Sequence, residues 1–161
     1  MPVAKTAQSA STTLRVRAPA KVNLYLAIAG ERRDGFHELL TVFERLDLAD
    51  ELVLEPRDGS AISCQCEGGE LPTDTQNVAV RAAQVLQEHC GVTRGVSITI
   101  RKRIPVAAGL GGGSSDAAAV LRTLNRWWEL GLSETELFQL GRQLGADVPF
   151  LLRGGIARVG G

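Results

Sequence analysis

The sequence lacks an excess of charge of either sign, because 18 basic residues balance 18 acidic ones. Without a net field to gather nucleic acid or an anionic membrane surface, any phosphate site must depend on local geometry. The sequence also lacks an uninterrupted apolar run of about 18 residues, the minimum for a membrane-spanning helix. We therefore expect neither nucleic acid nor a membrane as a partner.

Cysteine is also scarce, and its pattern bears on the cellular compartment. Cys64, Cys66 and Cys90 are odd in number and contain no C-x-x-C pair, so we expect no disulfide framework and predict a cytoplasmic protein. With His89 they match no common zinc-binding spacing, so we expect buried thiols and no metal site. Residues 1–13 lack the apolar core of a secretory signal and are predicted to be a disordered N-terminal segment.

Glycine is the residue in excess, with 18 among 161 residues, against an average usage of about 7%. The rest of the composition is ordinary, since 44% of the residues are hydrophobic and 22% are charged, as in soluble globular proteins. The length suits one domain with its own core. The positions of the glycines therefore carry more information than the composition does.

Alternation of apolar and polar residues predicts mainly extended segments in the first part of the chain. The predicted strands cover residues 14–16, 21–29, 39–46, 51–55, 61–66 and 96–100, of which the fifth is an edge strand. Turns are expected at residues 30–35 and 58–59, where glycine and aspartate occur. Residues 150–152 and 156–159 are predicted to form a strand pair that turns at Gly154 and Gly155.

Three helices are predicted from their capping and stop residues. The first helix begins after Asn77 and ends at Gly91, and the second begins at Ser114 or Ser115 and ends at Gly131. The third begins at a capping box of Ser133 and Glu136 and ends at Gly145. A loop over residues 146–149 is expected after the third helix. Because strands and helices occur without regular βαβ alternation, we predict the α+β fold class.

Residues 109–116, GLGGGSSD, form a glycine-rich loop that runs directly into a predicted helix. The free N–H groups at a helix start attract an anion, and glycines let phosphate oxygens approach the backbone. A Walker A loop requires a lysine after its glycines, and none follows them here. The G-x-G-x-x-G pattern requires a glycine at the position that Ser114 occupies. These residues favour a phosphate site of another type, while a merely flexible loop stays the alternative.

Four segments carry a resemblance to a known family. Residues 105–118, PVAAGLGGGSSDAA, resemble the P-x-x-x-G-L-G-S/G-S-S loop of the GHMP kinases, which phosphorylate small molecules. Residues 18–24 (APAKVNL), 33–37 (RDGFH) and 145–150 (GADVPF) resemble the branch of that family whose substrate carries a cytidine diphosphate group. The resemblance extends over residues 14–161.

This resemblance implies a fold and an activity. The expected fold is that of the GHMP kinase N-terminal domain, a mixed β-sheet packed with helices like domain 2 of ribosomal protein S5. The expected activity is ATP-dependent phosphorylation of a hydroxyl on a small molecule of the non-mevalonate isoprenoid pathway, with Mg²⁺ accompanying ATP. Residues 14–161 would form the ATP-binding domain, and we expect the C-terminal GHMP domain to be absent from this chain.

Two alternatives to this activity stay open. The chain could belong to another GHMP kinase with a different small substrate, such as homoserine or mevalonate. It could also be a truncated nucleotide-binding module without activity of its own. The resemblance implies no oligomeric state.

The resemblance also implies roles for individual residues. Asp147 corresponds to the base that accepts the proton of the acceptor hydroxyl, and Lys21 to the lysine that keeps it ionised and offsets negative charge. Asn23 corresponds to a residue that binds the acceptor. Phe36 and His37 correspond to the pair that stacks on the cytosine and hydrogen-bonds to it, although alone they could be a core phenylalanine beside a surface histidine.

A further set of positions is implied to bind ATP. The loop residues among them are Pro105, Val106, Ala107, Ala108, Gly109, Leu110, Gly111, Gly112, Gly113, Ser114 and Ser115. Asn77 and Lys102 correspond to contacts with the adenosine part of ATP. No residue is assigned to the metal ion.

Considered without the resemblance, these positions have ordinary structural alternatives. Asp147 could be a turn residue before a proline, and Lys21 a solvated lysine at a strand start. Asn77 could serve only as a helix cap, and Lys102 could belong to a solvated strand end.

Overall fold

The structure is a computed structural model that describes residues 12–31 and 37–160, with the side chains of residues 12–25 and 41–157. Most of the segment predicted to be disordered lies outside these ranges. The same is true of Phe36 and of most of the turn predicted at residues 30–35.

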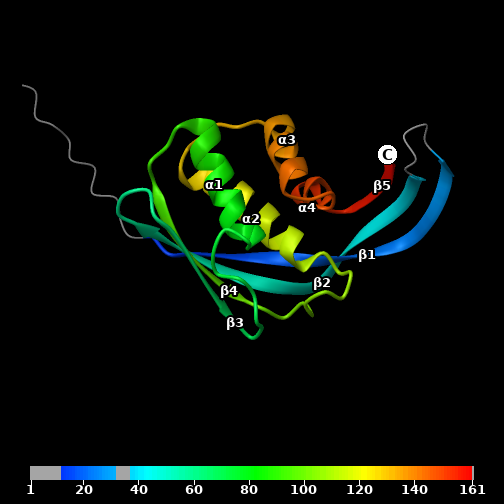
Figure 1. The fold of residues 1–161 in the computed structure, drawn as a ribbon, viewed down its shortest axis with the longest axis horizontal. Coiled ribbons are helices and arrows are strands. Elements are labelled where there is room, and N and C mark those ends of the chain that lie inside the picture. The colour runs from blue at the N-terminus through cyan, green and yellow to red at the C-terminus, as the bar shows by residue number, and fades with distance from the viewer. Residues whose placement is uncertain (1–11, 32–36, 161) are drawn as a thin grey trace, which may run out of the picture.

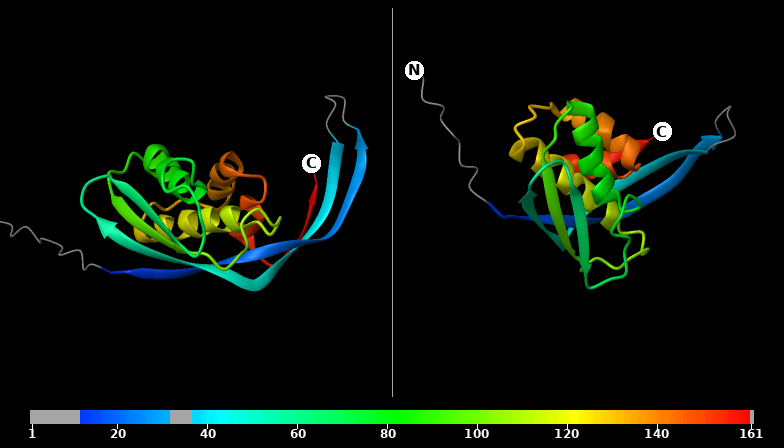
Figure 2. Two further views of the ribbon diagram at one scale, coloured as in Figure 1. Left: turned by 60° about the horizontal axis from the view of Figure 1, so that its bottom comes forward. Right: turned by 60° about the vertical axis from the view of Figure 1, so that its left-hand side comes forward.

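The described residues form a five-stranded mixed sheet with helices packed on one face (Figures 1 and 2). β1 (Leu14–Glu31) and β2 (His37–Arg57) pair antiparallel, and β4 (Gly95–Arg101) pairs antiparallel with β2. β3 (Ile62–Glu67) adds a parallel edge strand next to β4, and β5 (Ile156–Gly160) pairs antiparallel with the first part of β2. This mixed sheet packed with helices confirms the predicted α+β class.

The strands β1 and β2 are longer than the sequence pattern predicts. Each combines two predicted strands, residues 14–16 with 21–29 and residues 39–46 with 51–55. The pairing continues because register shifts beside Pro19 and Asn23 absorb the irregular residues. The resulting hairpin curves past the helical layer, and its far end extends beyond the helices (Figure 2).

Two helices follow their sequence signals closely. α1 (Val78–Cys90) begins after Asn77, whose side-chain oxygen accepts the N–H of the second helical residue, and ends at Gly91 in the left-handed conformation. α3 (Glu134–Leu144) begins at the predicted capping box, in which Ser133 and the third helical residue each cap the other. Because such caps are local interactions, they can be recognised in the sequence.

α2 (Gly112–Trp127) begins and ends earlier than predicted. Ser114 and Ser115 lie inside its first turn and do not cap it, because Gly111 is the N-cap residue with φ of 70°. A glycine enters that conformation without strain, so the helix can start before a side-chain cap is reached. Gly131 is not its stop either, because the chain already turns left-handed two residues after the helix.

α4 (Val148–Arg153) replaces the second half of the predicted loop over residues 146–149 and all of the predicted strand over residues 150–152. Asp147 is its N-cap residue, and Pro149 lies in its first turn, where a missing N–H costs nothing. A run of three apolar residues is too short for its period to separate strand from helix. β5 therefore pairs with β2 and not with residues 150–152.

The hydrophobic core lies between the sheet and the helices. Its fully buried side chains come from both layers and include Leu52, Leu54, Ile98 and Ile100 of the sheet and Leu86, Leu121 and Leu124 of the helices. Cys64 is also buried, and this burial raises the pKa of its thiol to about 12. No helix in the described part of the chain has the length and apolar character needed to cross a bilayer.

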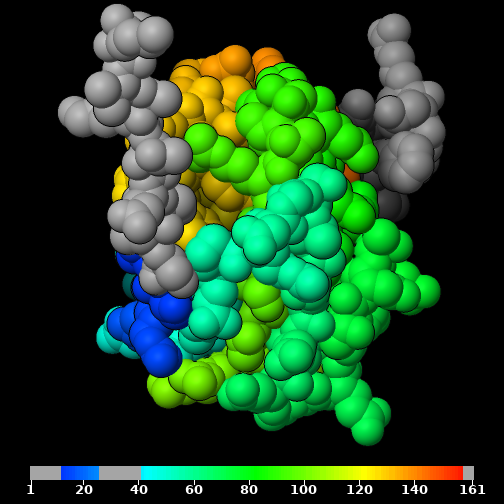
Figure 3. Space-filling model, turned by 90° about the vertical axis from the view of Figure 1, so that its left-hand side faces the viewer, coloured from blue at the N-terminus to red at the C-terminus, as the bar shows by residue number. Residues whose placement is uncertain are grey.

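Figure 3 shows the end of the molecule at which α1 lies beside the turn after β2, and two hydrogen bonds join these segments. The side-chain amide of Gln87 donates to the carbonyl oxygens of Ser60 and Arg94, each at 2.9 Å. These bonds tie the turn after β2 to the helix and to the start of β4. The glycine-rich loop follows the other end of β4, so the length of this strand lies between these hydrogen bonds and the loop.

Replacing Ser133 with alanine should lower the free energy of unfolding by about 1 kcal/mol, because its hydroxyl caps the Glu136 N–H and contacts the Glu136 carboxylate. Thr135→Ala is the matched control, since it removes an exposed hydroxyl from the same helical turn and should change the free energy by less than about 0.5 kcal/mol. Urea denaturation measures both values, and equal losses would contradict the capping role.

Candidate active site

The glycine-rich loop runs from the end of β4 to the start of α2 and lines a cavity of about 330 Å³. Ala107, Gly109 and Gly111 have positive φ values of 58°, 72° and 70°, so the backbone curls around the cavity. The first N–H groups of α2 have no acceptor within the helix. A cavity lined by backbone at a helix start is suited to a chain of phosphate groups.

Gly111 allows the loop to pack directly against β1. A Cβ atom at this position would lie 3.0 Å from Cγ of Lys21, so a larger residue would force the two segments apart. The Lys21 N–H donates to the carbonyl oxygen of Leu110 at 2.9 Å, and the Ser115 hydroxyl donates to that of Pro19 at 2.7 Å. The loop is therefore fixed on the strand by a hydrogen bond on each side of the glycine, one from a backbone N–H and one from a side-chain hydroxyl.

The Lys21 side chain is buried in the middle of β1, with 7% of it exposed. Its Nζ lies 3.2 Å from Oδ2 of Asp147, at the start of α4, and donates to Oδ1 of Asn23 at 2.8 Å. Asp147 is more open, with 28% of its side chain exposed. The structure thus brings together the three residues to which the resemblance assigns catalysis and acceptor binding.

Two aromatic residues that the sequence analysis did not single out complete this cluster. Nζ of Lys21 lies 4.6 Å from the ring centroid of Phe43, which pairs with Asn23 across β1 and β2. Phe43 in turn contacts Phe150 of α4, with ring centroids 5.1 Å apart. Sequence spacing gives no signal for Phe43, because its place beneath the lysine depends on the register of the hairpin.

Asn77 and Lys102 both have partners within the protein. Asn77 caps α1 through Oδ1, and its Nδ2 donates to the carbonyl oxygen of Pro72 at 2.8 Å. Lys102 lines the loop cavity, but its ammonium group is buried with the carboxylates of Asp50 and Asp116. Adenosine contacts by Asn77 and Lys102 stay predictions.

The cluster of Asp50, Lys102 and Asp116 was also not recognised as a unit in the sequence. The Lys102 ammonium donates to Oδ2 of Asp50 and, at 3.3 Å, to Oδ2 of Asp116. Burial raises the pKa of Asp116 to about 7; the Lys102 ammonium opposes this rise and the Asp50 carboxylate adds to it. Asp50 is in β2, Lys102 follows β4 and Asp116 is in α2. No local sequence pattern therefore reveals the cluster.

The pair predicted to recognise cytosine lies at the boundary of the described residues. Phe36 lies outside the described residues, and only the backbone of His37 is described, as the first residue of β2. His37 pairs with Glu31 at the far end of the hairpin.

The residues around the loop fit a phosphate-bearing cofactor better than a resident metal. Gly111 and Gly112 leave space that a Cβ atom would fill, against Lys21 and Lys102 respectively. Within residues 12–31 and 37–160, no three histidine, cysteine, aspartate or glutamate side chains form a group that could hold a metal ion. A Mg²⁺ ion in this cavity would therefore take most of its ligands from phosphate oxygens and water.

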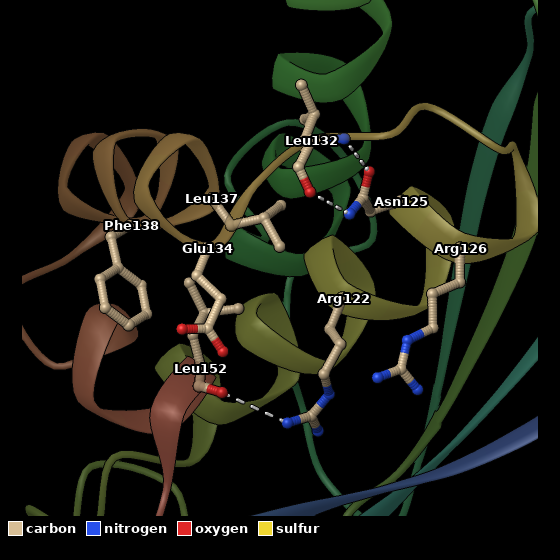
Figure 4. A pocket seen from close by; sticks show the side chains of 8 residues that line it. All are labelled: Arg122, Asn125, Arg126, Leu132, Glu134, Leu137, Phe138 and Leu152. Atoms are coloured by element: carbon tan, nitrogen blue, oxygen red, sulfur yellow. Dashed lines mark hydrogen bonds between the residues drawn. The ribbon is translucent and has the colours of Figure 1, made fainter.

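A second pocket of about 240 Å³ lies between α2, α3 and the end of α4 (Figure 4). Asn125 exchanges two hydrogen bonds of 3.0 Å with the backbone of Leu132, and Arg122 donates to the carbonyl oxygen of Leu152 at 3.5 Å. None of its lining residues belongs to the glycine loop or to the Lys21 cluster. It is therefore separate from the candidate active site.

Comparison with known proteins relates this chain to a group of kinases. Residues 77–155 match the family model described as GHMP kinases N terminal domain. Proteins named 4-diphosphocytidyl-2-C-methyl-D-erythritol kinase from Gloeobacter violaceus and Alcanivorax borkumensis are 52% and 50% identical over 145 and 144 residues. These matches cover 90% and 88% of this chain but 47% and 48% of the relatives, so the chain spans about half the length of the curated relatives it matches.

Solved structures give the same grouping. A crystal structure of 4-(cytidine 5'-diphospho)-2C-methyl-D-erythritol kinase is 47% identical with a TM-score of 0.81, covering 92% of this chain and 52% of that one. A homoserine kinase from Cytophaga hutchinsonii is 22% identical with a TM-score of 0.63, covering 91% of this chain and 44% of that one. The second similarity concerns the fold alone.

Gly111→Ala should lower the free energy of unfolding by roughly 1–3 kcal/mol, because alanine is strained at this positive φ and its Cβ would meet Lys21. Gly113→Ala is the matched control in the same loop. It has no positive φ and no atom within 4 Å of the added Cβ, so it should stabilise the protein by up to about 1 kcal/mol. Chemical denaturation gives both values, and effects of the same sign would contradict the close contact of loop and strand.

Proposed function

Because the chain belongs to the GHMP kinase family, we propose that it forms the ATP-binding part of a kinase that phosphorylates a hydroxyl of 4-diphosphocytidyl-2-C-methyl-D-erythritol. The observation that supports this most directly is the buried ammonium of Lys21, 3.2 Å from Asp147 and beside the glycine loop. A structural ion pair alone does not require a neighbouring backbone cavity at a helix start. A phosphoryl-transfer site combines a cradle for the phosphates with charged groups beside it.

Asp147 is the proposed general base. Its carboxylate lies at the start of α4, partly exposed, and can accept the proton of an acceptor hydroxyl as that oxygen attacks phosphorus. Lys21 lies between Asp147 and Asn23, so its ammonium group can offset negative charge at the attacking oxygen. Asn23 is exposed on the same strand and can hydrogen-bond the acceptor.

Phe43 and Phe150 hold this pair in place. The Phe43 ring contacts the Lys21 ammonium, and its contact with Phe150 links β2 to the helix that carries Asp147. Because catalysis of phosphoryl transfer depends mainly on positioning and charge, a rigid link between base and lysine has a direct effect on rate.

Residues 109–115 and the first turn of α2 are proposed to hold the phosphate groups of ATP through backbone N–H groups. ATP supplies the transferred phosphoryl group, and the accompanying Mg²⁺ neutralises part of its charge. The curled backbone of the loop and its attachment to β1 keep these donors beside Lys21. Asn77 and Lys102 stay proposed as neighbours of the adenosine.

The proposed substrate class accounts for other features of the chain. Phe36 and His37 would recognise the cytosine, and His37 is the first residue of β2. We propose that residues 14–161 are the ATP-binding domain of a cytoplasmic enzyme and that a C-terminal GHMP domain completes the cleft. Three exposed apolar residues support the proposed second domain, which would cover apolar surface of this kind. They are Leu24, Tyr25 and Ile156, which are 57%, 55% and 67% exposed.

Asp147→Asn in the full-length protein should lower the rate of substrate-dependent ADP release by about 10²- to 10⁴-fold, because the amide cannot accept the hydroxyl proton. The KM for ATP should change little. Asp58→Asn, in the exposed turn after β2, is the control and should leave the rate as it is. An unchanged rate for Asp147→Asn would overturn the assignment of the base.

His37→Ala should raise the KM for the cytidylyl substrate by about tenfold, the effect of one lost hydrogen bond to a buried base, and leave the KM for ATP unchanged. His89→Ala is the matched control, because His89 is the only other histidine and lies exposed on α1. Steady-state kinetics with each substrate varied measures both constants. If His37→Ala leaves the KM for the cytidylyl substrate unchanged, the result would favour a GHMP kinase whose substrate lacks a nucleobase.

A further inference from the structure

The buried cluster of Asp50, Lys102 and Asp116 lies against the glycine loop, and none of its three side chains is assigned a role in the transfer of the phosphoryl group. The three side chains come from β2, from the residue after β4 and from α2, and 0%, 4% and 2% of each is exposed. Two carboxylates share one ammonium group. Burial of ionised groups is costly, so a cluster of this kind below a functional loop requires an explanation.

Asp50 fixes the segment that leads into the loop. Its Oδ1 accepts the N–H groups of Arg103 at 2.6 Å and Ile104 at 2.9 Å, and its Oδ2 accepts from Lys102. Three consecutive residues after β4 are thereby bound to one carboxylate of β2. The segment immediately before Pro105 therefore has a defined conformation.

Lys102 connects this segment to the start of α2. Its Nζ lies 3.0 Å from the point at which a Cβ atom of Gly112 would stand, and the residue lines the loop cavity. The ammonium group is thus held against the first residue of the helix, at the floor of the cavity. Its charge acts on whatever occupies that cavity.

Asp116 sets the net charge of the cluster. Its Oδ1 is buried and has no hydrogen-bond partner among the residues that the structure describes. The charged and titratable groups that face it are Lys102, Asp50, Cys64 and Cys66. With both carboxylates ionised the cluster carries one negative charge; with a proton on Asp116 it is neutral.

We propose that Asp50 and Asp116 are positioning residues of the nucleotide site, and that Asp116 takes up a proton when a nucleotide's phosphates occupy the loop. This inference rests on the proposed function. The proton comes from solvent and binds Oδ1, the atom without a partner, while Oδ2 stays in contact with Lys102. A phosphate chain above the cluster repels its net negative charge, so the protonated form binds nucleotide more tightly.

The pH dependence has a definite sign. Burial raises the pKa of Asp116 to about 7 in the free protein, so the group is mostly protonated at pH about 6 and mostly ionised at pH about 8. Nucleotide affinity should therefore fall as pH rises through this range. One added charge near the phosphates corresponds to a decrease of about tenfold.

The test is calorimetric titration of the full-length protein with ADP in excess Mg²⁺ at pH about 6 and about 8. Wild type should bind about tenfold more weakly at the higher pH, whereas Asp116→Asn, neutral at both, should lose most of this difference. Asp58→Asn, an exposed aspartate, is the matched control and should behave as wild type. Titration of ADP without protein corrects for its own protonation.

A second readout needs no variant. At pH about 7, titrations in two buffers of different ionisation enthalpy should show that wild type takes up about half a proton on binding ADP. A merely structural carboxylate would take up none. This measurement keeps the proposal testable if Asp116→Asn does not fold.

Asp50 has a different expected signature. Asp50→Asn should weaken ADP binding by about tenfold at both pH values, because the segment before the loop loses its ionised acceptor. The pH dependence of ADP binding should also become weaker in this variant, because the Asp50 carboxylate no longer raises the pKa of Asp116.

The outcomes separate this inference from the proposed function. Wild type that binds ADP without proton uptake, or Asp116→Asn with the pH dependence of wild type, would overturn the inference and leave the kinase proposal intact. Wild type that binds no ADP would overturn both.

Discussion

The contact between the glycine loop and β1 is the constraint on which the rest of the site depends. Gly111 approaches Lys21 so closely that a single methyl group would separate them, and the backbone of Lys21 binds the carbonyl oxygen of Leu110. The same strand residue thereby binds the loop of the cavity with its backbone and contacts Asp147 with its side chain. The cavity and the candidate base are therefore linked through one residue of β1.

The site contains two buried lysines, and their ammonium groups have different partners. Lys21 has one carboxylate, an amide oxygen and an aromatic ring as partners, and it faces a partly exposed aspartate. Lys102 has two carboxylates, both fully inside the protein. The partner of the first ammonium is open to solvent, whereas the second ammonium is enclosed by two buried carboxylates. The same residue type thus occupies two different environments beside one loop.

Where sequence interpretation was correct, the interactions are local. The cap of α1 by Asn77 and the box at Ser133 involve residues two or three positions apart, so their pattern is visible in one dimension. Where it was wrong, the decisive interactions are distant. Residues 148–153 form a helix because their apolar side chains pack into the core. The long strands β1 and β2 stay continuous because their pairing with each other tolerates register shifts.

The amino-acid pattern alone was enough to locate the glycine loop, its position before a helix and the segments that resemble the GHMP kinases. These features depend on short-range geometry, in which glycine frees the backbone and a helix start exposes N–H groups. Only the tertiary structure placed Phe43 beneath Lys21 and gathered Asp50, Lys102 and Asp116 into one cluster. Such contacts arise from strand register and from packing of helices on the sheet, which bring together residues that no sequence spacing relates.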